Sequence, residues 1–277
     1  MTDQPLISII MAVYNARHFL DEAVESIRGQ TLADWELILI DDGSTDGTLE
    51  RIRTWEQQDA RIRVFQTLEN SGPGAARDFG ILKACGSYIA ILDSDDVAAP
   101  DRLEKQRSFL QAHPDVVIVG TQADFVDEKG AVTGCMNFPT SSEKLYRFMY
   151  RFVPLLLPTV MVNRSLLPDD FDWFEGWPFS EDTLLFFKLV QYGKLANLPD
   201  TLLKYRQHAS SVSARVPRET FLKTREARRR AVREMNYHPQ RMDRVVEGLQ
   251  SVAVRVLPER LLWKVYRLVR KWMVKNA

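Results

Sequence analysis

The chain has 277 residues, 45% hydrophobic and 27% charged, which is enough apolar sequence to bury one substantial core. This composition excludes a chain that is disordered over most of its length. The 37 Lys and Arg residues balance the 37 Asp and Glu residues, and a zero net charge taken alone argues against nucleic acid or an anionic membrane as a partner.

That balance conceals an asymmetry along the chain. Residues 215–277 hold 17 Lys and Arg against 6 Asp and Glu, a net charge of +11, so residues 1–214 carry −11. The apolar pattern also becomes helical throughout beyond residue 217. We therefore predict an acidic body over residues 1–214 and a basic helical extension over residues 215–277.

Cysteine content and the N-terminal sequence favour a cytoplasmic protein. Cys85 and Cys135 are too few for a disulfide framework or a four-thiolate metal site. The N-terminus lacks the basic and apolar regions of a signal peptide, and no apolar run of 18 residues occurs. We expect a reduced chain that does not span a membrane, although it can lie peripherally on the cytoplasmic face.

Up to about residue 93, short apolar runs alternate with segments in which apolar residues recur at helical spacing. The predicted strands cover residues 6–13, 35–42, 62–66 and 87–93, and the predicted helices about 19–27, 45–55 and 74–84. The nearly continuous Ile and Val content of these strands indicates burial on both faces. This rhythm predicts an α/β fold, with a parallel sheet and helices on both of its faces.

The second part of the chain is less regular. Pro100 is placed to open a helix that ends near His113, and an apolar strand follows. Residues 123–163 suggest irregular, partly antiparallel structure. Further on we predict a helix over 181–192, two short strands at 196–198 and 202–205, and three helices at about 218–235, 239–253 and 257–275.

Acidic side chains follow the predicted strands at the edge where α/β sheets bind ligands. Five carboxylates converge there: Asp41, Asp42, Asp93, Asp95 and Asp96. Crowded like charges require a partner, and hard oxygen ligands few in number suit Mg²⁺ or Mn²⁺ bound together with phosphates. The alternative is a set of Asx turns that cap the next helix, which accounts for one or two of the acids but not readily for three.

A glycine-containing segment, Asn70 to Arg77, resembles a dinucleotide-binding loop only superficially. Arg77 occupies the third glycine position, and the segment follows the third strand rather than the first, so we reject a dinucleotide site. The glycines can let the backbone approach a ligand. Two interpretations of Arg77 remain open: it reaches into the crevice, or it forms a surface ion pair near Asp78 or Glu69.

Six segments in chain order resemble family 2 of the inverting glycosyltransferases, which have the GT-A fold. They are SIIMAVYNA, LILIDDGSTDGT, NSGPGAARDFGI, YIAILDSDD, SEDTLLFFKL and YRQHASSVS, and they extend over about residues 6–213. Each is weak alone, but six in the family's order are highly specific. The chain departs from the family at Ala12, where proline is common, and this affects the bend after the first strand rather than the chemistry.

The resemblance implies roles for individual residues. The donor nucleotide would be held by five of them: Ala12, Tyr14, Asp41, Arg77 and Asp93. Asp95, the second acid of the Asp-Ser-Asp element, would bind the metal, and His208 falls where the family often has a residue near the diphosphate or metal. Asp182 corresponds to the general base. Its alternative role is that of a carboxylate stabilised by the helix dipole, which would also keep it ionised.

The acceptor and the sugar are expected to lie near the segment that precedes Asp182. Glu181 is its neighbour, and Trp177 and Phe179 can stack on a sugar ring, although paired aromatic residues are more often part of a core. The implied reaction is a single displacement, in which Asp182 takes the proton of an acceptor hydroxyl that attacks the anomeric carbon.

The expected partners are a UDP- or dTDP-sugar and a glycan or lipid-linked acceptor, in cell-envelope or exopolysaccharide synthesis, with no nucleic acid. The predicted helix over 257–275 has an apolar face beside a basic flank, which suits an anionic membrane surface, or else it packs on the core. A non-catalytic nucleotide-sugar sensor or scaffold is the alternative function. A nucleotidyltransferase is disfavoured because its glycine-rich, lysine-containing phosphate loop is missing near the N-terminus.

Overall fold

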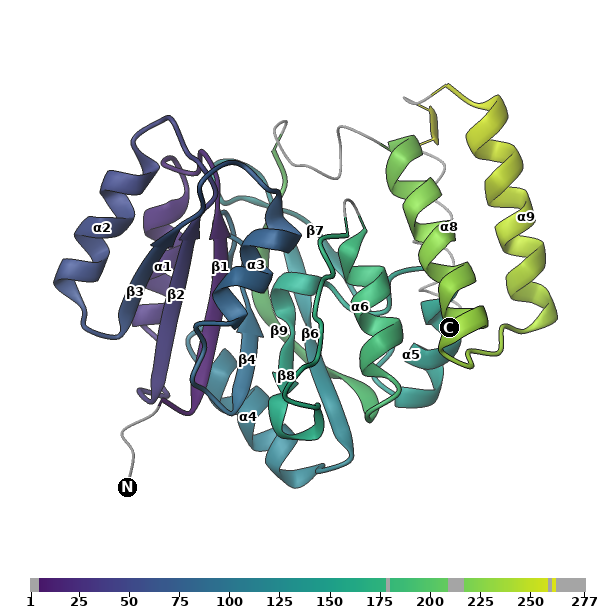
Figure 1. Ribbon diagram of the computed structural model, residues 1–277, viewed down its shortest axis with the longest axis horizontal. Coiled ribbons are helices and arrows are strands. Elements are labelled where there is room, and N and C mark those ends of the chain that lie inside the picture. The colour runs from purple at the N-terminus through teal and green to yellow at the C-terminus, as the bar shows by residue number, and fades with distance from the viewer. Residues whose placement is uncertain (1–4, 178–179, 209–216, 259–260, 263–277) are drawn as a thin grey trace.

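The computed structural model describes residues 5–177, 180–208, 217–258 and 261–262. Its centre is a nine-stranded mixed sheet whose strands run in the order β3-β2-β1-β4-β8-β6-β9-β5, with β7 beside β6. Figure 1 shows this sheet between helices, with α2 at one end of the long axis and α8 and α9 at the other.

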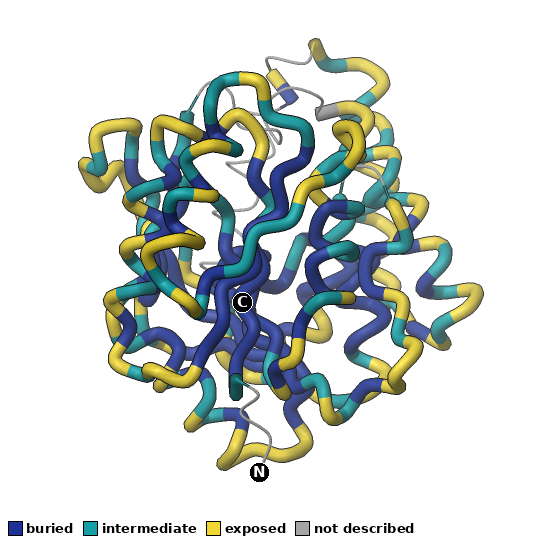
Figure 2. The backbone as a smooth tube through the Cα atoms, turned by 60° about the vertical axis from the view of Figure 1, so that its left-hand side comes forward, coloured by how far each residue is buried: buried dark blue, intermediate teal, exposed yellow. Residues whose placement is uncertain are grey.

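The first four large strands form the parallel half of the sheet. They are β1 (Ile7–Val13), β2 (Trp35–Asp41), β3 (Ile62–Gln66) and β4 (Tyr88–Ile91). In β1, Ile7, Ile9 and Met11 pack on one face while Ile10 packs on the other, because successive side chains of a strand alternate. Both faces are therefore apolar, as the sequence predicts, and Figure 2 shows the central strands as buried.

The two faces are covered by different helices. One carries α1 (Leu20–Arg28), α2 (Thr48–Gln58) and α4 (Arg102–Ala112), and the other α3 (Pro73–Ile81), α5 (Ser142–Met149) and α6 (Glu181–Leu189). Two longer helices follow, α8 (Pro217–Glu234) and α9 (Arg241–Val256). Ala231 of α8 packs with α6 in the second core, which joins this helical pair to the sheet domain.

The rest of the sheet is mixed. It contains β5 (Val97–Ala98), β6 (Val116–Val126), β7 (Val132–Met136), β8 (Met161–Asn163) and β9 (Lys194–Arg206), with short 3-10 turns at Leu157–Thr159 and Arg164–Leu166. β8 is antiparallel to β4 and β6, whereas β9 is parallel to β6. The predicted α/β fold is confirmed, with more antiparallel pairing than the first ninety residues indicate.

Two predictions about elements are wrong. The two short strands at 196–198 and 202–205 are one strand, β9, because Pro199 and Asp200 lie in a bulge where the register moves from Asn197 to Thr201. A bulge tolerates proline, which has no N–H to donate to the ladder. Helix α5 was not predicted within the irregular region.

Two further predictions stay untested. The predicted boundary between residues 214 and 215 falls in a stretch outside the described residues, as does most of the predicted helix over 257–275. Among the residues that the structure describes, none of the helices is long and apolar enough to cross a bilayer.

Candidate active site

The carboxyl ends of β1, β2 and β4 place the predicted donor residues along one edge of the sheet. Asp41 ends β2, Tyr14 follows β1 and is 51% exposed, and Asp93 follows β4. β1 lies between the other two strands, so Asp41 and Asp93 are separated by two strand spacings, about 10 Å. Ala12 pairs with Ile40 inside β1 and is partly buried beneath this edge.

Three of the five carboxylates form a cluster after β4. Asp93, Asp95 and Asp96 each offer an oxygen, and these atoms lie within 4.8 Å of one another. Burial and the nearby Asp93 carboxylate raise the pKa of Asp95. Burial, and then the charges of Asp95 and Asp93, raise the pKa of Asp96 well above its ordinary value. Crowded oxygen ligands whose charges oppose one another fit a divalent cation such as Mg²⁺ or Mn²⁺.

Arg77 reaches from α3 to residues that follow β4 and begin α6. Its guanidinium lies 2.7 Å from Asp93 Oδ1 and 3.0 Å from Glu181 Oε1. Only 7% of its side chain is exposed, so this is a buried ion pair and not the surface pair with Asp78 or Glu69. Burial opposes the charge of Arg77, but Asp93 and Glu181 outweigh it and raise its pKa. Arg77 thereby joins the end of β4 to the start of α6.

His208 lies beside the acidic cluster. Its Nε2 atom is 2.7 Å from Asp95 Oδ2, and its ring packs against Phe19 with the centroids 5.2 Å apart. The structure therefore brings together the two residues that the resemblance assigned to the metal, although they are 113 positions apart in the chain.

Arg206 was missed by the sequence analysis. It ends β9, is 2% exposed, and its backbone N–H donates to Asp96 Oδ1 at 2.8 Å. Its guanidinium donates to the Asp95 carbonyl and to Glu22 on α1. Arg206 thus fixes the backbone of the acidic turn and, two residues later, the position of His208. It also donates to the backbone carbonyls of Asp127 and Glu128. No spacing rule points to Arg206, because its partners come from three distant segments.

The two acids after β2 have different surroundings. Asp41 accepts a hydrogen bond from the Ser44 N–H at 3.2 Å, and its buried Oδ1 has no hydrogen-bond partner among the described residues. Asp42 instead accepts bonds from the backbone N–H groups of Ser71 and Gly72, at 3.0 and 2.8 Å. Asp42 therefore anchors the loop before α3 and does not join the acidic cluster, which corrects the predicted convergence of five carboxylates.

Asp182 lies in the first turn of α6, partly buried, and its Oδ1 accepts the N–H of Thr183 at 2.7 Å. Ser180 before it has a left-handed backbone, with φ 58°, and its hydroxyl lies 2.6 Å from that of Thr224 on α8. Helix α8 therefore helps to set where α6 begins.

The two aromatic residues predicted for the sugar pocket are Trp177 and Phe179. Trp177 lies beneath the Lys223 ammonium, 5.0 Å from its ring centroid, and its carbonyl faces Gly74 of α3. Phe179 lies outside the described residues.

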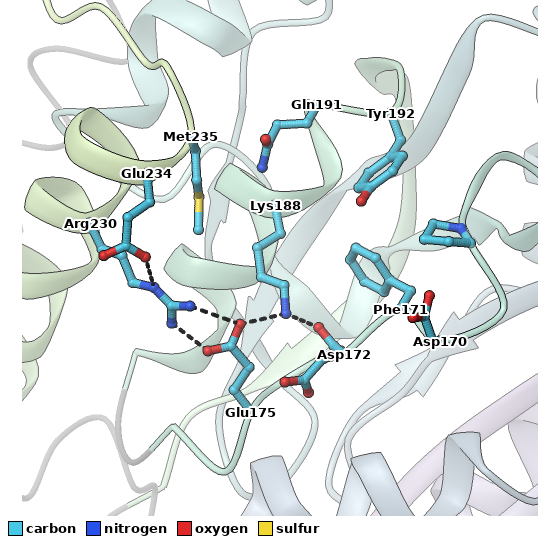
Figure 3. A pocket seen from close by; sticks show the side chains of 11 residues that line it. Asp170, Phe171, Asp172, Glu175, Lys188, Gln191, Tyr192, Arg230, Glu234 and Met235 are labelled. Atoms are coloured by element: carbon cyan, nitrogen blue, oxygen red, sulfur yellow. Dashed lines mark hydrogen bonds and ion pairs between the residues drawn. The ribbon is translucent and has the colours of Figure 1, made fainter.

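A separate cavity of about 340 Å³ lies between α6, α8 and the segment before Trp177. Figure 3 shows Glu175 bridging Lys188 and Arg230, with Arg230 also paired with Glu234 at 2.7 Å. Burial opposes ionisation of Glu175, but the bonds from Arg230 and Lys188 outweigh it and lower its pKa. These paired charges hold the segment in place, and none of the predicted site residues lines this cavity.

Comparison with known sequences decides the family. Residues 8–167 match the family model described as glycosyl transferase family 2, which is more than half of the chain. The chain belongs to glycosyl transferase family 2. It is 42% identical over 164 residues to an uncharacterized glycosyltransferase of Haemophilus influenzae, covering 59% of this chain and 64% of the relative.

A second relative of this glycosyltransferase is named for a polysaccharide. The putative teichuronic acid biosynthesis glycosyltransferase TuaG of Bacillus subtilis is 44% identical over 107 residues, covering 39% of this chain and 42% of the relative. The chain thus spans less than two thirds of the length of either relative.

Solved structures show the same fold at low identity. TarS of S. aureus, in complex with UDP-GlcNAc, has a TM-score of 0.63 at 22% identity, covering 80% of this chain and 65% of the other. The mannosyltransferase PcManGT of Pyrobaculum calidifontis, in complex with GDP-Man and Mn²⁺, has a TM-score of 0.62 at 16% identity, covering 96% and 80%. These structures confirm the GT-A fold expected from the sequence.

Proposed function

We propose that this family 2 glycosyltransferase moves a sugar from a nucleoside diphosphate to an acceptor hydroxyl and inverts the anomeric configuration. The observation that carries the proposal is the bridge from Arg77 to both Asp93 and Glu181. It puts the end of β4, where a diphosphate would bind, in one crevice with the start of α6, where Asp182 lies.

The donor is proposed to lie along the carboxyl edge of the sheet. Asp41, whose buried Oδ1 has no partner among the residues the structure describes, and the exposed Tyr14 would hold the base and ribose, with Ala12 beneath them. Asp41 and Asp93 are separated by two strand spacings, about 10 Å. This separation leaves room for the nucleoside near Asp41 and the diphosphate near Asp93. A UDP- or dTDP-sugar is the donor we favour, in keeping with the TarS complex.

Asp93, Asp95 and His208 are the residues that would hold a divalent cation, for which their oxygen and imidazole ligands are suited. Such a cation, when bound, offsets the negative charge that grows on the departing diphosphate. The Mn²⁺ in the PcManGT structure supports the same choice. Arg206 fixes the backbone that carries these ligands.

Asp182 would act as the general base. An acceptor hydroxyl placed at the start of α6 transfers its proton to the carboxylate and attacks the anomeric carbon from the face opposite the diphosphate. The position in the first turn of the helix favours the ionised form, which a base requires. Glu181, which pairs with Arg77, and Trp177, whose carbonyl faces Gly74 of α3, are proposed to contact the sugar or the acceptor.

The acceptor class is proposed from the relatives. TuaG is named for teichuronic acid biosynthesis, which supports a cell-envelope glycan or a lipid-linked precursor as acceptor. We also propose that the chain acts on the cytoplasmic side, where its two free cysteines would stay reduced.

Replacing the base tests the proposal. Asp182→Asn keeps the shape of the side chain but cannot accept a proton, so kcat should fall by about 10²–10⁴ while the KM for the donor stays within about twofold. Glu50→Gln, an exposed change on α2, is the control and should leave both unchanged. Release of nucleoside diphosphate at the wild-type rate in Asp182→Asn, with acceptor present, would refute the assignment.

A further inference from the structure

A second charged site lies at the far end of the molecule from α2. A groove of about 340 Å³ runs between α8 and α9, and four arginines line it: Arg225, Arg229, Arg244 and Arg255. Figure 1 shows the two helices side by side at this end. The groove shares no residue with the crevice at the strand ends, and nothing in the proposed transfer reaction uses it.

Most of the positive charge in this groove is uncompensated. Arg225 forms a long ion pair, 3.9 Å, with Glu247, the one acidic residue among those that line the groove in the described part of the chain. The guanidinium groups of Arg229, Arg244 and Arg255 are exposed and form no ion pair or hydrogen bond within the described part of the chain. On the same helix, Arg230 pairs with both Glu175 and Glu234. Like charges around one hollow repel, so an anion from outside the chain would stabilise the groove.

Gly248 keeps the floor of the groove open. It lies in the middle of α9, where glycine is disfavoured, and a Cβ atom there would meet nothing within 4 Å. Close packing against α8 therefore does not require glycine. Without a side chain at this position, a group entering from solvent can approach the helix between the arginines.

An apolar stripe runs along α9 beside the groove. Its members repeat at spacings of three and four residues, which places them on one helix face. They are Met242, Val245, Leu249, Val252 and Val256, each between 54% and 73% exposed. Helix α9 thus presents aliphatic side chains and unpaired arginines to solvent together.

We propose that the α8–α9 face docks on an anionic lipid bilayer, with phosphate headgroups in the arginine groove and the apolar stripe in the interfacial layer. Phosphate suits guanidinium groups, and a helix with an apolar stripe beside basic residues suits the membrane interface. The stripe has no aromatic residue on which bases could stack, which disfavours single-stranded RNA.

A second copy of the chain is a less favourable occupant. α8 carries seven Lys and Arg against three Asp and Glu, and α9 three against two, so facing copies would bring net positive charge together. The proposal uses only α8 and α9 and is separate from the predicted helix over 257–275. It also does not depend on the proposed function, because binding is measured without donor or turnover.

Vesicle co-sedimentation of the full chain tests the proposal. With phosphatidylcholine vesicles that contain 30% phosphatidylglycerol, at 0.1 M salt, we expect the protein to sediment with the lipid, whereas pure phosphatidylcholine should bind at least tenfold less. Each basic residue near such a surface contributes about fivefold. The double variant Arg229→Glu/Arg244→Glu should therefore lose at least about thirtyfold in partitioning.

Matched variants separate charge from folding. Arg53→Glu/Lys129→Glu changes two exposed basic residues elsewhere on the surface and should retain at least one third of wild-type partitioning. Gly248→Glu adds a carboxylate where a Cβ meets nothing and should lower partitioning about fivefold, while Gly248→Lys should not lower it. Leu249→Ser/Val256→Ser replaces two of the five apolar residues of the stripe and should lower partitioning about tenfold.

Several results would overturn the proposal. Equal sedimentation with both kinds of vesicle, or with neither, excludes an anionic lipid surface. Equal losses in the groove variant and its matched control exclude the groove. Wild-type vesicle binding by Leu249→Ser/Val256→Ser would show that the apolar stripe does not enter the interfacial layer, which overturns the proposed mode of docking. A concentration-dependent dimer in sedimentation velocity that this variant abolishes, without vesicle binding, identifies a second copy as the occupant.

Discussion

Two regions of this glycosyltransferase concentrate charge in opposite ways. After β4, the carboxylates of Asp93 and Asp95 contact the side chains of Arg77 and His208, and these two partners come from distant segments of the chain. Between α8 and α9, by contrast, Arg229 and Arg244 meet no opposite charge in the described part of the chain.

The difference indicates how each region can bind. A site with both signs already fixed needs no rearrangement to receive a diphosphate, its cation and an attacking hydroxyl, which is what catalysis by positioned charge requires. A surface on which positive charge predominates can be neutralised by an external anion, and its affinity for that anion should therefore depend strongly on salt. The variants below are ordered from the largest expected effect to the smallest.

Asp95→Asn removes a negative charge from the acidic cluster after β4. The amide keeps the shape but removes the charge that would hold the cation and the diphosphate, so the transfer rate should fall at least about 10³-fold. Initial rates of nucleoside diphosphate release at saturating Mn²⁺ measure this. A rate within fivefold of wild type would mean that the acidic cluster is structural, and Glu50→Gln should leave the rate unchanged.

Arg206→Met removes an arginine whose charge is paired within the chain, for comparison with an arginine of the groove. The change leaves the carbonyl of Asp95 and the carboxylate of Glu22 without their donor, so we expect unfolding free energy to fall by about 3 kcal/mol. Arg229→Met, in the groove, should change it by less than about 0.5 kcal/mol. Urea unfolding measures both, and equal effects would remove the distinction between the two regions.

Glu175→Gln tests the ion pair between Glu175 and Arg230, an arginine of α8 whose charge is paired. The lowered pKa of Glu175 means that its ionised form is stabilised in the folded state, so the contribution is present above the ordinary value of 4.5 and is lost as pH falls through the lowered value. We expect the variant to be less stable by about 1.5–2 kcal/mol at pH 7. The difference from wild type should vanish in acid. Glu219→Gln, exposed on the same helix, is the control in urea titrations at several pH values.

Gly248→Ala has the smallest expected effect. The added methyl group meets nothing within 4 Å, and alanine favours a helix interior over glycine, so unfolding free energy should rise by about 0.5–1 kcal/mol. A loss of stability in urea unfolding would show that the groove floor is packed and not open.

The sequence predicted one region better than the other for a physical reason. Continuous apolar runs fix β1, β2 and β4, and chain order places Asp41 and Asp93 at the same sheet edge. What joins that edge to α6 is a contact between Arg77 and Glu181, 104 positions apart, and no local pattern specifies it. The same holds for Arg206, whose partners are Asp95, Asp96 and Glu22.

The remaining differences also arise from tertiary structure. Two separate strands were predicted on either side of Pro199, but they form one strand, β9, whose bulge accommodates the proline while β6 continues alongside. Asp42 has the same residue type and nearly the same position as Asp41, yet it binds the loop at Ser71 and Gly72. The excess of arginine beyond residue 215 was evident from composition, but which of these arginines lack partners depends on how α8 packs against α9.

Calorimetric titration with UDP tests the central claim most directly, because it asks which charged region binds the donor. Wild-type protein should bind UDP with Mn²⁺ present and at least about tenfold more weakly with EDTA. Asp95→Asn should lose the Mn²⁺-dependent binding, whereas Arg229→Glu/Arg244→Glu should keep it unchanged. Undiminished binding by Asp95→Asn, or its loss in the groove variant, would contradict the account.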